Sequence, residues 1–117
     1  MNIRGLIPRT VPTKVPDLAN ILSDEDQLAF ALTETWLADH SDAETQILGY
    51  AMFRLDRKRQ RPGKGRNSGG VSLYVKDDYA VSARQIFDYS CGVIETVAVH
   101  IEALNLVLTV VYKQLDN

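Results

Sequence analysis

Glu34 is the acidic residue whose position in this sequence most suggests chemistry. It follows the apolar run Leu28 to Leu32, which is typical of a buried strand, and its neighbours are Thr33, Thr35 and Trp36. Ligands often bind at the ends of strands in α/β sheets. However, a single carboxylate holds magnesium only together with waters and further oxygen ligands. On spacing alone, a metal ligand and an ordinary surface acid both remain open.

Glu95 is a second acid in an unusual position. It alternates with Val93, Val97, Val99 and Ile101, so a strand would place its carboxylate on an apolar face. A buried carboxylate is unfavourable unless it is paired or hydrogen-bonded. We therefore predict a structural acid bonded to a neighbouring backbone group or to an arginine.

The other reactive residue types lack the partners that their chemistry requires. His40 and His100 have no Cys or His at zinc-ligand spacing, and Cys91 has no nearby base in the sequence. We expect a plain half-buried thiol at Cys91. The glycines of Gly63-Lys64-Gly65-Arg66 and Gly69-Gly70 do not match the P-loop pattern.

The charge distribution is strongly uneven. From Arg54 to Arg66 there are seven basic residues and one acid, Asp56, which gives this segment +6; because the whole chain carries −2, the remainder carries −8. Pro62 and the nearby glycines predict a mobile loop over about residues 57–68. A solvated disordered segment and a local contact with a polyanion such as nucleic acid are both open.

The elements that would position these residues are mostly strands. Helical spacing predicts a helix over Pro16–Asp24, and capping-box spacing at Ser41-Asp42-Ala43-Glu44 predicts a single helical turn. A turn is expected at Asp77-Asp78, and another over Glu102–Leu104. The predicted strands are Leu28–Glu34, Ala51–Leu55, Val71–Lys76, Ala80–Phe87, Val93–Ile101 and Asn105–Tyr112.

Asn105–Tyr112 is apolar on both faces, which predicts a central strand covered on both sides. Only Lys113 to Asn117 follow it, and no strand precedes Asn2. We therefore expect a single incomplete domain over residues 1–117 that is cut at both edges. An uncovered sheet face would favour self-association.

Bulk composition favours a folded domain in a reducing compartment. The chain has 117 residues, of which 45% are hydrophobic, and its single cysteine cannot form an internal disulfide. No apolar stretch reaches the roughly 20 residues of a membrane span, and the first residues lack a signal-peptide pattern. We expect a cytoplasmic or nuclear location without membrane contact.

Several short motifs occur in an order that resembles a known family. They are Asn2-Ile3-Arg4-Gly5-Leu6, Leu32-Thr33-Glu34-Thr35-Trp36-Leu37, Gly49-Tyr50, Phe53-Arg54-Leu55-Asp56-Arg57, Gly69-Gly70-Val71 and Val111-Tyr112. This set is similar to the amino-terminal half of an endonuclease/exonuclease/phosphatase (DNase I-like) domain. It most resembles the endonuclease domain of non-LTR (LINE-like) retrotransposons, which precedes a reverse transcriptase.

The resemblance implies a partial four-layer α/β sandwich and Mg²⁺-dependent cleavage of DNA. It implies that Asn2 lies by the active site, that Glu34 ligates the metal and that Tyr112 approaches the scissile phosphate. DNA would be the partner, and the basic loop would hold its backbone. The loop residues concerned are Arg57, Lys58, Arg59, Arg61, Lys64 and Arg66.

The sequence also departs from the family pattern. Tyr112 is followed by Lys113-Gln114-Leu115 instead of an arginine and prolines, and the later family segments that supply an acid–amide pair and the general base have no counterpart. We therefore predict a hydrolase fragment that does not cleave DNA by itself. The alternatives are a non-catalytic nucleic-acid-binding module and a plain α/β interaction domain.

Overall fold

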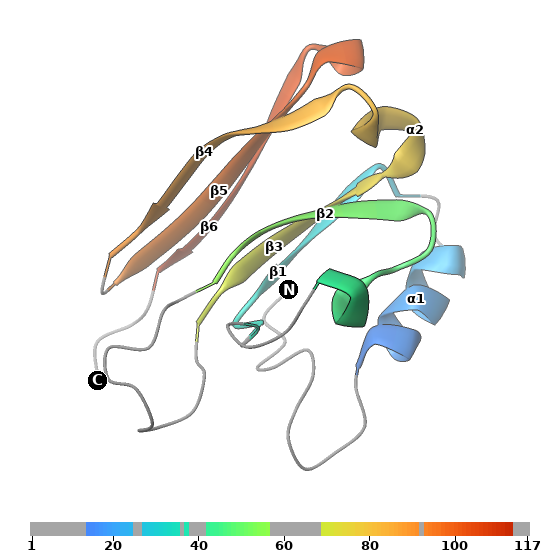
Figure 1. The fold of residues 1–117 in the computed structure, drawn as a ribbon, viewed down its shortest axis with the longest axis horizontal. Coiled ribbons are helices and arrows are strands. Elements are labelled where there is room, and N and C mark those ends of the chain that lie inside the picture. The colour runs from blue at the N-terminus through green and yellow to red at the C-terminus, as the bar shows by residue number, and fades with distance from the viewer. Residues whose placement is uncertain are drawn as a thin grey trace.

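In the part of the chain that the structure describes, two three-stranded antiparallel sheets dominate the fold (Figure 1). The computed structural model describes residues 14–24, 27–35, 37, 42–56, 69–91 and 93–113. The first sheet has the order β1-β3-β2, with β1 at Ala29–Thr33, β3 at Val71–Lys76 and β2 at Tyr50–Leu55. The second has the order β4-β5-β6, with β4 at Ala83–Ser90, β5 at Ile94–Ile101 and β6 at Leu106–Lys113. Together with two helices, these sheets are compatible with the predicted α/β class and its mainly antiparallel strands.

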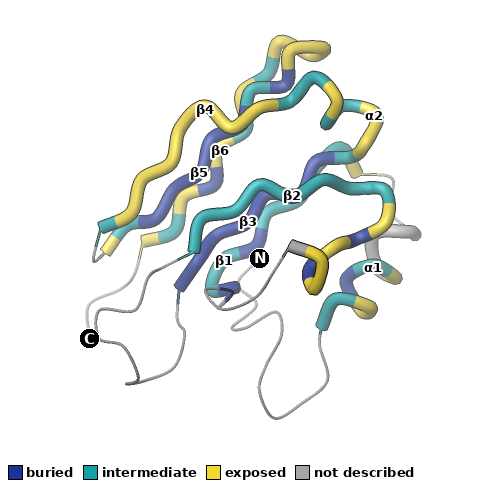
Figure 2. Tube along the Cα trace, in the orientation of Figure 1, coloured by how far each residue is buried: buried dark blue, intermediate teal, exposed yellow. Residues whose placement is uncertain are grey.

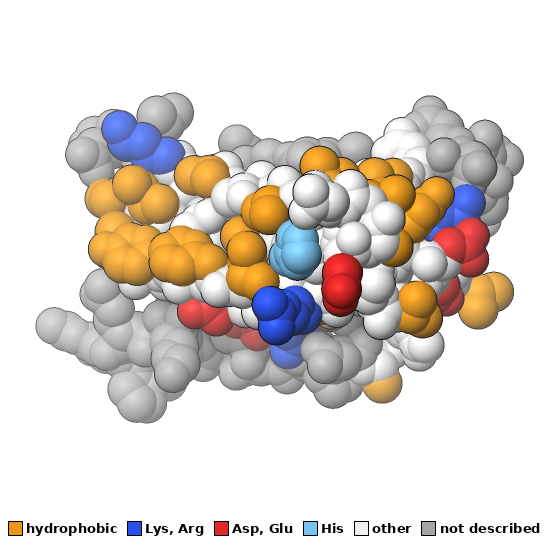
Figure 3. All heavy atoms as spheres, turned by 90° about the horizontal axis from the view of Figure 1, so that it is seen from above, with side chains coloured by type: hydrophobic (Ala, Val, Ile, Leu, Met, Phe, Trp, Pro, Cys, Tyr) orange, Lys and Arg blue, Asp and Glu red, His pale blue; other side chains and the backbone are white. Residues whose placement is uncertain are grey.

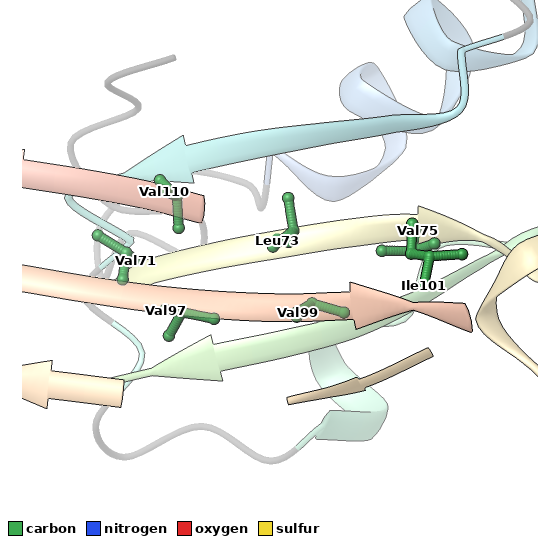
Figure 4. Close-up of a cluster of buried hydrophobic side chains, with 7 residues drawn as sticks. All are labelled: Val71, Leu73, Val75, Val97, Val99, Ile101 and Val110. Carbon is green, nitrogen blue, oxygen red and sulfur yellow. The ribbon is translucent and has the colours of Figure 1, made fainter. Parts of the chain in front are cut away.

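The two sheets face each other across a core of aliphatic side chains. Alternate residues of β3 and β5 point into this core, as the period of two of a β-strand requires (Figure 4). Burying each such side chain contributes about 1.5–3 kcal/mol. The buried members are Val71, Leu73, Val75, Val97, Val99, Ile101 and Val110.

Helix α1 (Val15–Asp24) covers the other face of the first sheet. Leu18 of the helix packs with Leu32 and Tyr74, so a second buried cluster lies beneath it. Pro16 lies in the first turn, where its missing N–H breaks no helical hydrogen bond. The order of layers is therefore helix, sheet, sheet, and burial is greatest along β3 and β5 (Figure 2).

A tyrosine anchors the short 3₁₀ helix η1 (Asp42–Thr45) to the first sheet. The Tyr74 hydroxyl donates a hydrogen bond to the Thr45 carbonyl oxygen at 2.8 Å. The Tyr74 ring stacks on Phe30, with ring centroids 4.6 Å apart and an interplanar angle of 3°. Tyr74 is completely buried.

Most predicted elements are confirmed. The helix, the turn at Asp42 and five of the six strands agree with prediction to within one residue at each end. The antiparallel pairing of β5 with β6 across η2 (Glu102–Leu104) is also confirmed. The predicted mobile loop over residues 57–68 lies outside the described residues.

The prediction was wrong around Asp77. The expected turn at Asp77-Asp78 is the start of a short helix, α2 (Asp77–Ala80), and acids in a first helical turn interact favourably with the helix dipole. The following strand therefore begins at Ala83 instead of Ala80, and it ends at Ser90 instead of Phe87.

The central position predicted for Asn105–Tyr112 was also wrong, whereas the expected uncovered face is present in the described residues. There, β6 pairs only with β5, and its burial alternates along the strand. Val107 and Val111 remain 50% and 61% exposed on the outer face. Hydrophobic side chains gather over one end of this face (Figure 3). Branched apolar residues suit any pleated surface, so a run of them does not distinguish a covered face from an open one.

Candidate functional site

The candidate site lies where the end of β1 meets the end of β6. The Tyr112 hydroxyl donates a hydrogen bond to Glu34 Oε1 at 2.7 Å, between residues 78 positions apart in the sequence. Tyr112 lies on the inward face of β6, since it is paired with the buried Glu95 of β5. Glu34 directly follows the last residue of β1. The contact therefore joins the two sheets.

Glu34 has a backbone conformation that is unusual for a residue with a side chain. Its φ is 59°, in the left-handed region. Such a conformation costs on the order of 1–3 kcal/mol and persists where the surrounding structure fixes it. The next residue restores the pairing with β3, because the Thr35 N–H donates to the Gly70 carbonyl oxygen at 3.3 Å. The left-handed residue thus lies inside a hydrogen-bonded framework.

Two glycines, Gly69 and Gly70, form the entry to β3, immediately before Val71, because the backbone there takes positive φ angles. Gly69 and Gly70 have φ values of 70° and 92°, which glycine adopts without a Cβ penalty. The Gly70 N–H donates to Glu95 Oε2 at 2.9 Å, and Glu95 has an exposed fraction of 0%. This bond confirms the prediction that Glu95 is an acid bonded to a backbone group.

An ion pair lies at the end of β2, beside the entry to β3. Arg54 Nη2 and Asp56 Oδ2 are 3.3 Å apart, and both side chains are about four-fifths buried, at 19% and 21% exposure. The register pairs Leu55 with Val71, the residue after Gly70. Arg54 and Asp56, which began the basic segment in the sequence, therefore neutralise each other within the fold.

Two of the predicted site residues, Glu34 and Tyr112, are in direct contact. The others lie outside the described residues: Asn2, Arg57, Lys58, Arg59, Arg61, Lys64 and Arg66. Sequence reasoning did not connect Gly70 with the site. Two features of the sequence could have indicated this connection: the pair Gly69-Gly70 immediately before a strand, and the acid Glu95 on an apolar face.

The donor groups at this site fit a magnesium ion held largely by water and substrate. Mg²⁺ usually keeps several waters and takes one or two carboxylates together with phosphate oxygens. Glu34 offers one partly buried carboxylate, whose Oε1 accepts the hydrogen bond from Tyr112. Thr35 Oγ1 is buried and has no hydrogen-bond partner in the described part of the chain. Within those same ranges, no three His, Cys, Asp or Glu side chains cluster as a protein-only metal cage would require.

Cys91 lies outside this framework, in the connection between β4 and β5. The backbone N–H groups of Val93 and Ile94 and the Tyr89 side chain hold the pKa of the thiol below its ordinary value, although burial opposes them. The side chain is partly buried, as predicted.

The fold and site define a mostly β domain with a carboxylate–phenol pair at the seam of two sheets. No protein-family model matches the sequence, and no curated protein matches it either. Among the described helices, none is long and apolar enough to cross a membrane.

Proposed function

We propose that this chain is the amino-terminal part of a Mg²⁺-dependent DNA endonuclease domain of the DNase I-like class, similar to that of non-LTR retrotransposons. The observation that carries the proposal is the 2.7 Å hydrogen bond between Tyr112 and Glu34. The motif resemblance placed both residues at one active site although they are far apart in the sequence. The helix–sheet–sheet layering is compatible with part of a four-layer sandwich.

In this proposal the two residues have different tasks. The Glu34 carboxylate binds Mg²⁺, and the Tyr112 hydroxyl orients that carboxylate and lies beside the scissile phosphate. A bound ion would polarise a phosphoryl oxygen and would stabilise charge on the leaving group. By the resemblance, Asn2 belongs to the same active site. The basic residues from Arg57 to Arg66 hold the DNA backbone. The parent polyprotein of the retrotransposon also contains a reverse transcriptase.

The chain alone is expected to bind without cleaving. The family segments that supply the second acid–amide pair and the general base have no counterpart in this sequence. With Glu34 assigned to the metal and Tyr112 to orienting it, neither residue is left to act as the general base that activates the attacking water. We therefore propose an inherited metal and DNA site with incomplete catalytic machinery.

A magnesium titration followed by backbone amide chemical shifts tests the metal site. Mg²⁺ is expected to shift the amides of Glu34 and Thr35, and Glu34→Gln is expected to abolish that response. Asp78→Asn is a matched control because Asp78 is an exposed acid in α2, which follows the opposite end of β3. Equal responses in wild type and Glu34→Gln would remove the metal role of Glu34.

DNA binding and plasmid nicking separate the remaining functions. Binding that weakens steeply with salt is expected if the basic residues neutralise phosphates. No nicking that depends on Glu34 is expected with Mg²⁺; its appearance would contradict the predicted inactivity. An absence of both Mg²⁺ response and salt-dependent DNA binding would favour a plain interaction domain.

A further inference from the structure

Glu95 is a buried carboxylate that the proposed chemistry does not use. It has an exposed fraction of 0% and lies at the second position of β5, on the face that packs against the first sheet. A buried carboxylate is unfavourable unless donors surround it. One of its oxygens accepts the Gly70 N–H at 2.9 Å. Its neighbours Val97 and Val99 on the same face fill the core with aliphatic side chains instead.

The contacts of Glu95 lead directly to Glu34. Gly70, which donates to Glu95, also accepts the Thr35 N–H, and Thr35 follows Glu34. Glu34 in turn accepts the Tyr112 hydroxyl, and Tyr112 is the direct partner of Glu95 in the β5–β6 register. Hydrogen bonds, the peptide link between Glu34 and Thr35, and the β5–β6 pairing therefore join five residues in a closed ring. The ring contains Glu95 of β5, Tyr112 of β6, Gly70 before β3, and Glu34 and Thr35 after β1.

We infer that Glu95 is a positioning residue that fixes the Glu34–Tyr112 pair through Gly70 and Thr35. The Glu95 carboxylate binds the N–H of Gly70, just before β3, and the Gly70 carbonyl oxygen binds the N–H of Thr35, the residue after Glu34. The left-handed backbone of Glu34, at φ 59°, is then kept in place from both sides. A charge-assisted bond to a carboxylate is roughly twice as strong as a neutral one, which suits this task. The positioning follows from geometry alone, whereas its consequence for metal binding rests on the proposed function.

The alternative is that Glu95 only holds the sheets together. Thr96 provides the matched comparison because it is the next residue of β5 and is 8% exposed. Its hydroxyl donates to the Val110 carbonyl oxygen at 2.8 Å. Thr96→Val therefore removes one buried hydrogen bond of the same strand without touching the ring. A purely structural role for Glu95 predicts the same local behaviour in both variants.

Amide hydrogen exchange of the whole chain tests the positioning. In Glu95→Ala we expect the Thr35 amide to exchange at least tenfold faster than in wild type, while Leu32 in β1 changes only with global stability. Glu95→Gln keeps an acceptor of the same length, so we expect it to restore part of the Thr35 protection. In Thr96→Val, Thr35 and Leu32 should change by the same factor. If Glu95→Ala does not fold, Glu95→Gln should still raise Thr35 exchange about threefold relative to Leu32, consistent with a neutral bond of about half the strength.

Magnesium titration of the same samples separates this inference from the proposed function. We expect a weaker Mg²⁺ response at Glu34 and Thr35 in Glu95→Ala, and a wild-type response in Thr96→Val. Faster Thr35 exchange without any Mg²⁺ response in wild type would support the positioning and overturn the metal site. A Mg²⁺ response that Glu95→Ala leaves unchanged, together with unchanged Thr35 exchange, would overturn the positioning and leave the metal site intact.

Discussion

Two tyrosine-to-phenylalanine changes should separate a structural phenol from a site phenol. Tyr74 is completely buried, and its hydroxyl donates to the carbonyl oxygen of the buried Thr45 at 2.8 Å. Tyr112 is partly exposed, and its hydroxyl donates to the partly exposed Glu34 at 2.7 Å. Each change removes one oxygen and leaves the ring in place, so the difference in stability reports what the hydroxyl does.

The magnitudes follow from burial. Loss of a hydrogen bond that leaves a buried acceptor without its donor costs about 1–3 kcal/mol, so we expect about 2 kcal/mol for Tyr74→Phe. Water can replace the phenol beside Glu34, so we expect about 0.5–1 kcal/mol for Tyr112→Phe. With an unfolding entropy of about 2.1 cal/mol/K per residue over 117 residues, these values correspond to decreases in Tm of about 8 °C and about 2–4 °C.

Thermal and urea denaturation, followed by circular dichroism, measure both changes. The urea m-value should stay constant, which shows that stability and not compactness has changed. If Tyr112→Phe destabilised the chain as much as Tyr74→Phe, the phenol of Tyr112 would be a structural group. The assignment of Tyr112 to a site would then lose its physical basis.

Three further outcomes test the core, the thiol and the outer sheet face. Val97→Ala should lower the free energy of unfolding by about 1.5–3 kcal/mol in urea denaturation because Val97 is completely buried, whereas Val107→Ala on the open face should cost less than about 0.5 kcal/mol. The pKa of Cys91 is lowered chiefly by the Val93 N–H, so iodoacetamide at a pH below the ordinary thiol pKa should alkylate the native chain faster than the urea-unfolded chain; equal rates would contradict this. Because the folded pKa is the lower one, the thiolate adds stability above the unfolded pKa, and this contribution is lost as the pH falls through the folded pKa. Phe87→Lys, at a side chain that is 54% exposed, should reduce the predicted self-association in light scattering, and a wild-type monomer at high concentration would count against that prediction.

Local patterns in the sequence predicted most elements of the fold because helices and strands have fixed periods. Val71, Leu73 and Val75 alternate with polar or aromatic residues, and the structure buries these three in the core between the sheets. The partners of a strand are not contained in its own period. The apolar run of β6 therefore predicted a central strand, whereas β6 lies at the edge of the described sheet, with Val107 and Val111 exposed.

The sequence indicated some residues of the candidate site but not all of the contacts between them. The resemblance singled out both Glu34 and Tyr112, and the structure brings their side chains within 2.7 Å of each other. The bond from Gly70 to Glu95 joins the residue before β3 to β5, which belongs to the other sheet, and no spacing rule relates residues 70 and 95. Only the unfavourable burial of Glu95 indicated that some donor had to lie nearby. Its identity required the three-dimensional packing.

The position of this site at a seam has an energetic consequence. The two buried clusters lie on opposite faces of the first sheet, and the larger one lies between the two sheets. Glu34 also depends on both sheets, because its backbone is tied to β3 through Thr35 and its side chain is tied to β6 through Tyr112. A left-handed residue that costs on the order of 1–3 kcal/mol persists only where several contacts fix it together. A change that shifts one sheet against the other should therefore disturb Glu34 together with the core between the sheets.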